Sequence, residues 1–117
     1  MPIIERKGIK INVDDDGYLV NKDDWNENVA HALAEIEGVG ELTKEKMDII
    51  KFMREFNEKY QSFPMLGMVC KNIHQPQKCV TEQFMEPLKA WKIAGLPNPG
   101  PMVLGYIKGH SFIVKPG

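Results

Sequence analysis

The chain has 117 residues, of which 43% are hydrophobic and 26% are charged, and its formal net charge is -1. This length and apolar content suit one domain with one core. A net charge near zero excludes the overall basic excess that non-specific binding to nucleic acid or an anionic membrane requires. The charge is uneven, because residues 1–60 hold 14 acidic and 9 basic side chains, whereas residues 61–117 hold 2 and 6. The C-terminal half is therefore electropositive.

The N-terminus lacks the basic start and the apolar run of a secretion signal. No stretch of the sequence approaches the ~20 apolar residues that a membrane-spanning helix needs. We therefore expect a cytoplasmic protein without a membrane span.

The first twenty residues predict short strands. Apolar and polar side chains alternate through 9–13, and the turn-forming run Asp14 to Gly17 separates them from Tyr18 to Val20. This pattern indicates a small strand pair or meander.

Two helices are predicted next. Asp23 or Asp24 can cap a helix of about 13 residues that ends before Gly38. Thr43 caps a second helix, whose apolar stripe includes Met47, Ile50, Phe52, Met53, Phe56 and Tyr60.

The C-terminal half predicts shorter helices. Pro64 opens a segment over 65–73, and a further helix over 80–94 must be kinked or divided at Pro87, which lacks an N–H donor. Gly95 can end this helix. Residues 104–107 and 111–114 flank a glycine-containing turn and predict a small hairpin.

The two cysteines, Cys70 and Cys79, permit several interpretations. A zinc site is disfavoured, because the spacing is wide and only His74 lies nearby. The leading interpretation is two inert thiols, one buried and one exposed. The alternative is a reversible disulfide, in which Lys71 and Lys78 would favour the thiolate forms.

No other set of residues predicts catalysis. Asp23, Asp24 and Glu27 lie where a helix begins, and negative charge is favourable there without any catalytic role. His31 and His110 are isolated, and no nucleophile triad or phosphate-binding loop occurs. We expect no enzyme activity, no metal and no cofactor.

A DNA-binding helix-turn-helix is a further possibility, because a short turn over 61–63 joins the second and third predicted helices. The third segment offers only Lys71 and Asn72 for contacts with DNA, too few for the phosphate contacts that supply most of the affinity. A DNA-binding transcriptional regulator therefore remains a secondary alternative.

The residues Ala90 to Pro99 read Ala-Trp-Lys-Ile-Ala-Gly-Leu-Pro-Asn-Pro. This stretch resembles the C-terminal arm of the DsrC/TusE family, which reads roughly Ala-Cys-Lys-Ile-Ala-Gly-Leu-Pro-Lys-Pro-Thr-Gly-Cys-Val. The blocks Asp16 to Leu19 and Asp24 to Glu27 resemble the family's N-terminal part. In the arm, Trp91 and Met102 occupy the positions of the family's two cysteines.

The resemblance implies an α+β fold, in which a small β-meander packs on an array of four to five short helices with a helix-turn-helix-like core. It implies a domain over 1–103 that includes the arm, followed by an extension over 104–117. Members of the family are small sulfur-relay proteins, also called gamma subunits of dissimilatory sulfite reductase. Their arm carries sulfur on cysteine, which neither Trp91 nor Met102 can do.

The function that the resemblance implies is a non-catalytic, regulatory partner of a sulfite reductase or a sulfurtransferase. The expected docking residues lie on and beside the arm and are Lys89, Trp91, Lys92, Leu96, Pro97 and Pro99. Two alternatives remain open, a redox-active sulfur carrier that uses Cys70 and Cys79, and the transcriptional regulator. The sequence leaves the oligomeric state undetermined.

Overall fold

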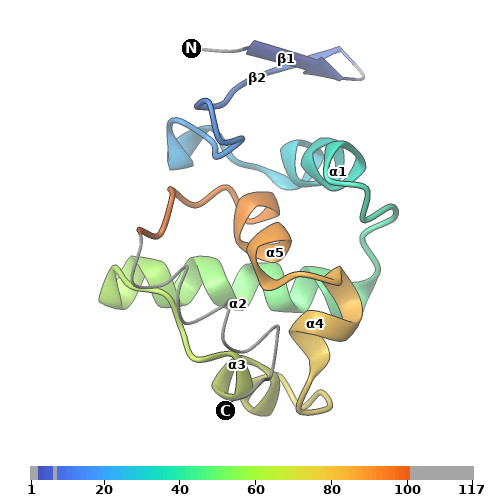
Figure 1. Ribbon diagram of the computed structural model, residues 1–117, viewed down its shortest axis with the longest axis vertical. Helices are drawn as coiled ribbons and strands as arrows, with labels where there is room; N and C mark the ends of the chain where they lie inside the picture. Colours follow the sequence, from blue (N-terminus) through green and yellow to red (C-terminus); the bar gives the residue numbers. More distant parts are fainter. Residues whose placement is uncertain (1–2, 7, 101–117) are drawn as a thin grey trace, which may run out of the picture.

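The computed structural model describes residues 3–6 and 8–100 of the chain. They form a two-stranded sheet, a 3-10 turn and five α-helices (Figure 1). The elements are β1 (Ile3–Arg6), β2 (Ile9–Asn12), η1 (Lys22–Asp24), α1 (Glu27–Ile36), α2 (Lys44–Tyr60), α3 (Leu66–Asn72), α4 (Cys79–Phe84) and α5 (Pro87–Ile93). The predicted α+β class is confirmed, while the hairpin expected over 104–114 lies outside the described residues.

The main strand pair lies before the turn at Asp14 to Gly17, whereas the sequence predicted a pair on either side of that turn. β1 and β2 are antiparallel, with Ile3 opposite Asn12. The turn at Asp14 also forms, because its Oδ1 accepts hydrogen bonds from the Asp16 and Tyr18 amides at 2.9 and 3.0 Å. Beyond it the pairing is limited to one bridge between Val13 and Leu19.

The predicted start of the first helix is wrong. Asn21 accepts a hydrogen bond from the Asp23 amide and closes the turn η1, after which Trp25 is extended. Asn26 is the actual cap of α1, since its Oδ1 accepts from the Val29 amide at 2.9 Å. Trp25 therefore precedes α1 in extended backbone, and its side chain can contact other parts of the fold.

The longest helix, α2, begins as predicted, with the Thr43 hydroxyl accepting from the Lys46 amide at 3.3 Å. Its buried residues are Ile49, Ile50, Met53 and Asn57. The predicted stripe is thus divided, because Phe52, Phe56 and Tyr60 lie outside this buried set.

The last predicted helix is two helices, because Pro87 begins α5 as its first residue and Met85 leaves α4 with a φ of +69°. α5 contacts α1, α2 and α4, and it lies at the centre of the helical array (Figure 1). Its buried residues include Ala90, Trp91 and Ile93.

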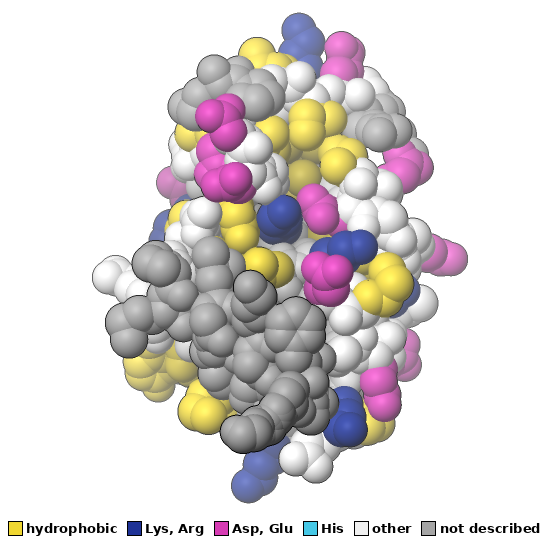
Figure 2. Space-filling model, viewed as in Figure 1, with side chains coloured by type: hydrophobic (Ala, Val, Ile, Leu, Met, Phe, Trp, Pro, Cys, Tyr) yellow, Lys and Arg dark blue, Asp and Glu magenta, His cyan; other side chains and the backbone are white. Residues whose placement is uncertain are grey.

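In Figure 2 acidic side chains gather at the upper left of the face, and toward its centre acidic and basic side chains are interspersed with apolar ones. No helix among residues 3–6 and 8–100 combines the length and apolar character needed to cross a membrane.

Candidate functional site

The arm leaves the end of α5 in a fixed direction, because two side chains of the body hold its backbone carbonyls. The Trp25 indole Nε1–H donates to the Ile93 oxygen at 2.9 Å. Arg54 of α2 donates from Nη1 to the Ala94 oxygen at 2.7 Å and from Nη2 to the Lys22 oxygen at 3.2 Å. The bonds to Ile93 and Ala94 satisfy carbonyls that the end of α5 leaves without an intrahelical partner.

Trp25 and Arg54 also contact each other. The Arg54 guanidinium carbon lies 4.3 Å from the centroid of the Trp25 ring, a cation–π arrangement. Burial lowers the pKa of Arg54, while the nearby carboxylates of Asp23 and Glu58 act in the opposite direction. A guanidinium stays charged in proteins, so this anchor holds across the physiological pH range.

Gly95 is required where the arm turns away from α5. Its φ is +73°, a region that side-chain-bearing residues rarely adopt. A Cβ atom built on Gly95 would collide with Cδ1 of Trp25 and lie 3.1 Å from Cδ2 of Leu19. The backbone of the arm therefore packs directly on the Trp25 ring.

Trp91 is a core residue with 2% of its surface exposed. Its ring packs against Phe63 with centroids 4.7 Å apart, and its Nε1–H donates to the Pro97 oxygen at 2.6 Å. The side chain thereby closes a loop between α5 and the arm. No thiol is present at this position, and the space is filled by an aromatic ring.

The predicted docking set is divided by burial. Trp91 and Leu96 are 2% and 1% exposed, so they offer almost no surface to a partner in this structure, and their part in docking stays a prediction. Pro97 is exposed, while Lys89, Lys92 and Pro99 are half-buried. These four form the accessible part of the expected set. Met102 lies outside the described residues.

The accessible part of the arm touches the N-terminal meander. The Lys92 Nζ lies 5.1 Å from the centroid of the Tyr18 ring. Burial raises the pKa of the Tyr18 hydroxyl, and the carboxylates of Asp16, Asp14 and Glu37 raise it further. The amide of Asn98 approaches Asp16 Oδ2 at 3.5 Å. Lys92 therefore offsets some of the negative charge that gathers around Tyr18.

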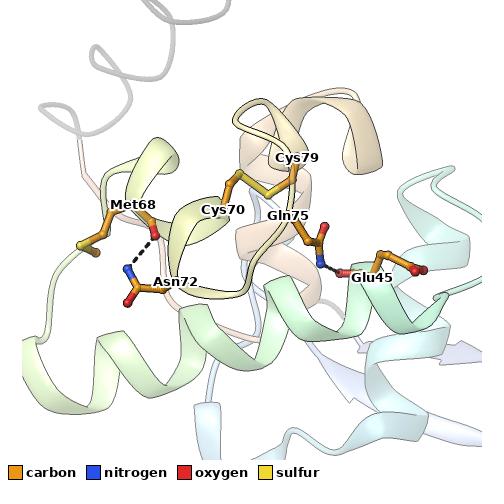
Figure 3. The surroundings of a disulfide bond; sticks show 6 residues. All are labelled: Glu45, Met68, Cys70, Asn72, Gln75 and Cys79. Atoms are coloured by element: carbon orange, nitrogen blue, oxygen red, sulfur yellow. Dashed lines mark hydrogen bonds between the residues drawn. A yellow bond between two sulfur atoms is a disulfide. The ribbon is translucent and has the colours of Figure 1, made fainter.

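Cys70 and Cys79 form a disulfide that joins α3 to α4 (Figure 3), with a Cα–Cα distance of 5.7 Å. Both cysteines are buried, at 0% and 1% exposure. The leading interpretation of two inert and unequally exposed thiols is wrong, and the alternative of a pair is the one that the structure contains. Lys71 and Lys78 beside them are exposed.

The turn between the two cysteines is held against α2. The backbone N–H of Gln75 donates to the Cys70 carbonyl oxygen at 2.9 Å. The Gln75 side-chain Nε2 donates to the Glu45 carbonyl oxygen at 3.1 Å (Figure 3). His74 is exposed and has a φ of +59°. The sulfur atoms of both cysteines are joined to each other in the disulfide, and the described residues contain no group of three potential metal ligands.

The acidic residues considered for catalysis do not converge. Asp23, Asp24 and Glu27 are exposed, and Glu27 pairs with Lys51 of α2 at 3.0 Å. His31 is also exposed. The sequence did not predict the roles of Trp25 and Arg54. Trp25 belonged to a recognisable motif, but nothing local to Arg54 indicates a contact forty positions away in the chain.

An open hollow of about 320 Å³ lies beside the base of the arm. Apolar surface comes from Trp25 and Leu96, and the remaining lining is charged or polar, namely Lys22, Asp23, Lys51, Arg54, Glu55, Asn57 and Glu58. Charges of both signs line it in equal number, so it lacks the basic excess that would select an anion.

Comparison with known proteins gives consistent matches. Residues 5–103 match the family described as DsrC like protein. A sulfurtransferase TusE homolog of Haemophilus influenzae is 36% identical over 101 residues, which cover 79% of this chain and 92% of that protein. The dissimilatory-type sulfite reductase subunit gamma of Nitratidesulfovibrio vulgaris is 35% identical over 101 residues, covering 85% and 96%.

Solved structures agree with these sequence matches. The crystal structure described as dissimilatory sulfite reductase I (DsrI) aligns with a TM-score of 0.76 at 31% identity, covering 86% of this chain and 98% of that chain. The oxidised gamma subunit of dissimilatory sulfite reductase (DsrC) from Archaeoglobus fulgidus aligns with a TM-score of 0.72 at 33% identity, again covering 86% and 98%.

Proposed function

This chain belongs to the DsrC-like protein family, and we propose that it binds a sulfite reductase or a sulfurtransferase without carrying sulfur on its arm. Relatives are named as a sulfurtransferase and as a sulfite reductase subunit. In this role the protein is regulatory, because it occupies a docking site that a sulfur-carrying relative would otherwise use.

The observation that carries this proposal is the buried indole at position 91. Sulfur carriage requires a thiolate, which is the nucleophile in persulfide and disulfide chemistry. Trp91 provides none, and its Nε1–H is engaged with the Pro97 oxygen at 2.6 Å. Met102 has a thioether, which has no ionisable proton and cannot serve as that nucleophile.

The surface that remains for docking is small and carries two lysines. Lys89 and Lys92 lie on α5, and Pro97 and Pro99 lie on the arm that follows it. Because Trp25 and Arg54 hold the arm at its base, the prolines are presented in one geometry. A preorganised surface loses less conformational entropy on binding than a mobile one. An acidic surface on the partner fits this chemistry.

A pulldown with purified sulfite reductase and sulfurtransferase tests the proposal. Lys89→Glu should weaken capture, because it reverses a charge on the docking surface. Lys71→Glu is the matched control, since it makes the same change on the exposed side of α3. Equal capture by both variants, or no capture of either enzyme by the unmodified protein, would contradict the proposal.

The second candidate function is a redox-active carrier based on Cys70 and Cys79, and the disulfide between them favours it. An external dithiol would first reduce the bond to two thiols and itself become a disulfide; one Cys thiolate would then take a sulfane sulfur from a donor persulfide, leaving the donor as a thiol. Attack by the second thiol would release sulfide and re-form the disulfide. Burial of both cysteines opposes this function, because the donor must reach a sulfur atom.

Mass spectrometry distinguishes the two candidates. The reduced protein is incubated with a low-molecular-weight persulfide, and the Cys70→Ser and Cys79→Ser variants are treated in parallel. We expect no added sulfur in the unmodified protein. A stable gain of one sulfur atom at either cysteine would replace the binding-only proposal with the carrier.

A further inference from the structure

The disulfide lies in a part of the fold where the helices are short. α3 has seven residues and α4 has six, and neither begins with a side chain that accepts a hydrogen bond from its first turn. Helices of this length are not stable by themselves in water, so they depend on the contacts that surround them. The bond between Cys70 and Cys79 joins the two helices covalently (Figure 3).

The connection from α4 to α5 is a strained turn. Met85 has a φ of +69° and a ψ of -48°, and across it the Glu86 N–H donates to the Phe84 carbonyl oxygen at 2.7 Å. A γ-turn of this hand is rare and unfavourable for a residue that carries a side chain, and it persists only where the surrounding structure holds it. The turn therefore favours opening of α4 once other restraints are removed.

The same two helices adjoin the indole that fixes the arm. α4 contacts both α3 and α5, and α5 carries Trp91. Phe63 lies three residues before α3 and packs on the Trp91 ring, with centroids 4.7 Å apart. The Trp91 Nε1–H in turn donates to the Pro97 oxygen at 2.6 Å. Movement of α3 and α4 would therefore uncover Trp91 and weaken its hold on the arm.

We propose that the disulfide is a redox latch for the arm. An external dithiol supplies two electrons and two protons, becomes a disulfide, and leaves Cys70 and Cys79 as two thiols. Because both cysteines are buried, this exchange takes place while α3 and α4 are locally open. Without the bond the open chain is less restricted, so α3 and α4 open more often and the bond from Trp91 to Pro97 opens with them. An external disulfide re-forms the latch by the reverse exchange.

The latch requires no transfer of sulfane sulfur, which distinguishes it from the carrier considered above. For an arm that docks a partner, the oxidised latch would keep the docking surface preorganised, and reduction would raise the entropy lost on binding. Only this consequence rests on the proposed docking function.

Hydrogen exchange followed by NMR tests the latch in the full chain and without a partner. After reduction with dithiothreitol, the Trp91 indole N–H and the amides of α3 and α4 should exchange about tenfold to a hundredfold faster. The Trp91→Phe variant assigns the indole resonance. In the reduced protein these groups should also exchange faster than the amides of Ile49 and Ile50, two fully buried residues of α2, because the opening is local.

The Cys70→Ala/Cys79→Ala variant is the matched control, and it should exchange rapidly at these groups with or without dithiothreitol. Exchange of the Trp91 indole that is unaffected by reduction of the wild-type protein would overturn the proposal. Exchange at Trp91, α3 and α4 that is no faster than at Ile49 and Ile50 in the reduced protein would overturn it as well, because the chain would then open only as a whole. A negative pulldown leaves both measurements unaffected.

Discussion

At the scale of single residues, the path of the arm depends on two tryptophans, each of which holds it by a different contact. Trp25 supports the arm from beneath, with its ring against Gly95 and its N–H on the Ile93 oxygen. Trp91 belongs to α5 itself and reaches forward to the Pro97 oxygen. Both bonds end on backbone carbonyls, so they fix the path of the arm whatever side chains it carries.

Truncating Trp91 should destabilise the whole domain. Trp91→Ala removes a buried ring and should lower the free energy of unfolding by about 3–5 kcal/mol. Trp91→Phe keeps most of the ring but loses the bond to Pro97, and it should lower this free energy by about 1–2 kcal/mol. Urea denaturation measures both, with Tyr60→Phe as an exposed control. A change below about 0.5 kcal/mol for Trp91→Ala would contradict the core position described here.

Tyr18 should make stability fall at alkaline pH. Its folded-state pKa is raised, chiefly by burial and then by Asp16, Asp14 and Glu37. Below the unfolded-state pKa of about 10 the hydroxyl is neutral in both states, so its contribution is fully present. As pH rises from there through the folded-state pKa, the unfolded chain releases the proton first and the contribution is lost.

Denaturation curves between about pH 9 and about pH 11 check this expectation. Tyr18→Phe should show a shallower loss of stability over this range than the unmodified chain. Identical pH profiles for the Tyr18→Phe variant and the unmodified protein would show that the hydroxyl does not titrate differently on folding.

At the scale of elements, local chemistry predicted some helix ends and missed others. Thr43 begins α2 and Pro87 begins α5 because a cap and a missing N–H act within one turn. Trp25 lies outside α1 because Asn21 caps the turn η1 just before it, and the helical spacing of apolar residues does not predict that turn. Pairing of Cys70 with Cys79 depended on α3 packing against α4, and the contact between Arg54 and Ala94 depended on the whole fold.

The disulfide between α3 and α4 should contribute to stability through the unfolded state. Closing a loop of about ten residues restricts the unfolded chain by about 2–3 kcal/mol. The Cys70→Ala/Cys79→Ala variant and the reduced wild-type protein should both lose about this amount in urea denaturation. A reducing agent should leave the double variant unchanged. If reduction also leaves the wild-type protein unchanged, the two sulfurs are not paired in solution.

At the scale of the whole molecule, charge separation along the chain should influence association. The first 60 residues hold 14 acidic and 9 basic side chains, whereas the rest hold 2 and 6. The two lysines of α5 therefore lie in the basic half of a molecule whose net charge is only -1. Such an arrangement speeds and orients the first encounter with a partner more than it raises the affinity of the final complex.

The association rate with a captured sulfite reductase or sulfurtransferase should fall as salt is added. Between about 0.01 M and about 0.15 M salt the screening length shortens from about 30 Å to about 8 Å, and we expect the rate to fall by about tenfold. Stopped-flow or surface-binding kinetics measure this, and Lys89→Glu should flatten the dependence. A rate that is insensitive to salt would argue for an uncharged docking surface.

The hydrogen bond from Trp91 to the Pro97 oxygen also affects whether a single substitution could give this chain a sulfur-carrying cysteine in its arm. A cysteine introduced at position 91 would hold its sulfur one bond beyond Cβ, close to α5, in a site where the indole is now only 2% exposed. Arg54 and Trp25 would still hold the backbone that follows, so the arm would still pass over that site. Reversion would therefore need at least two steps, one to restore the thiol and one to free the peptide that covers it.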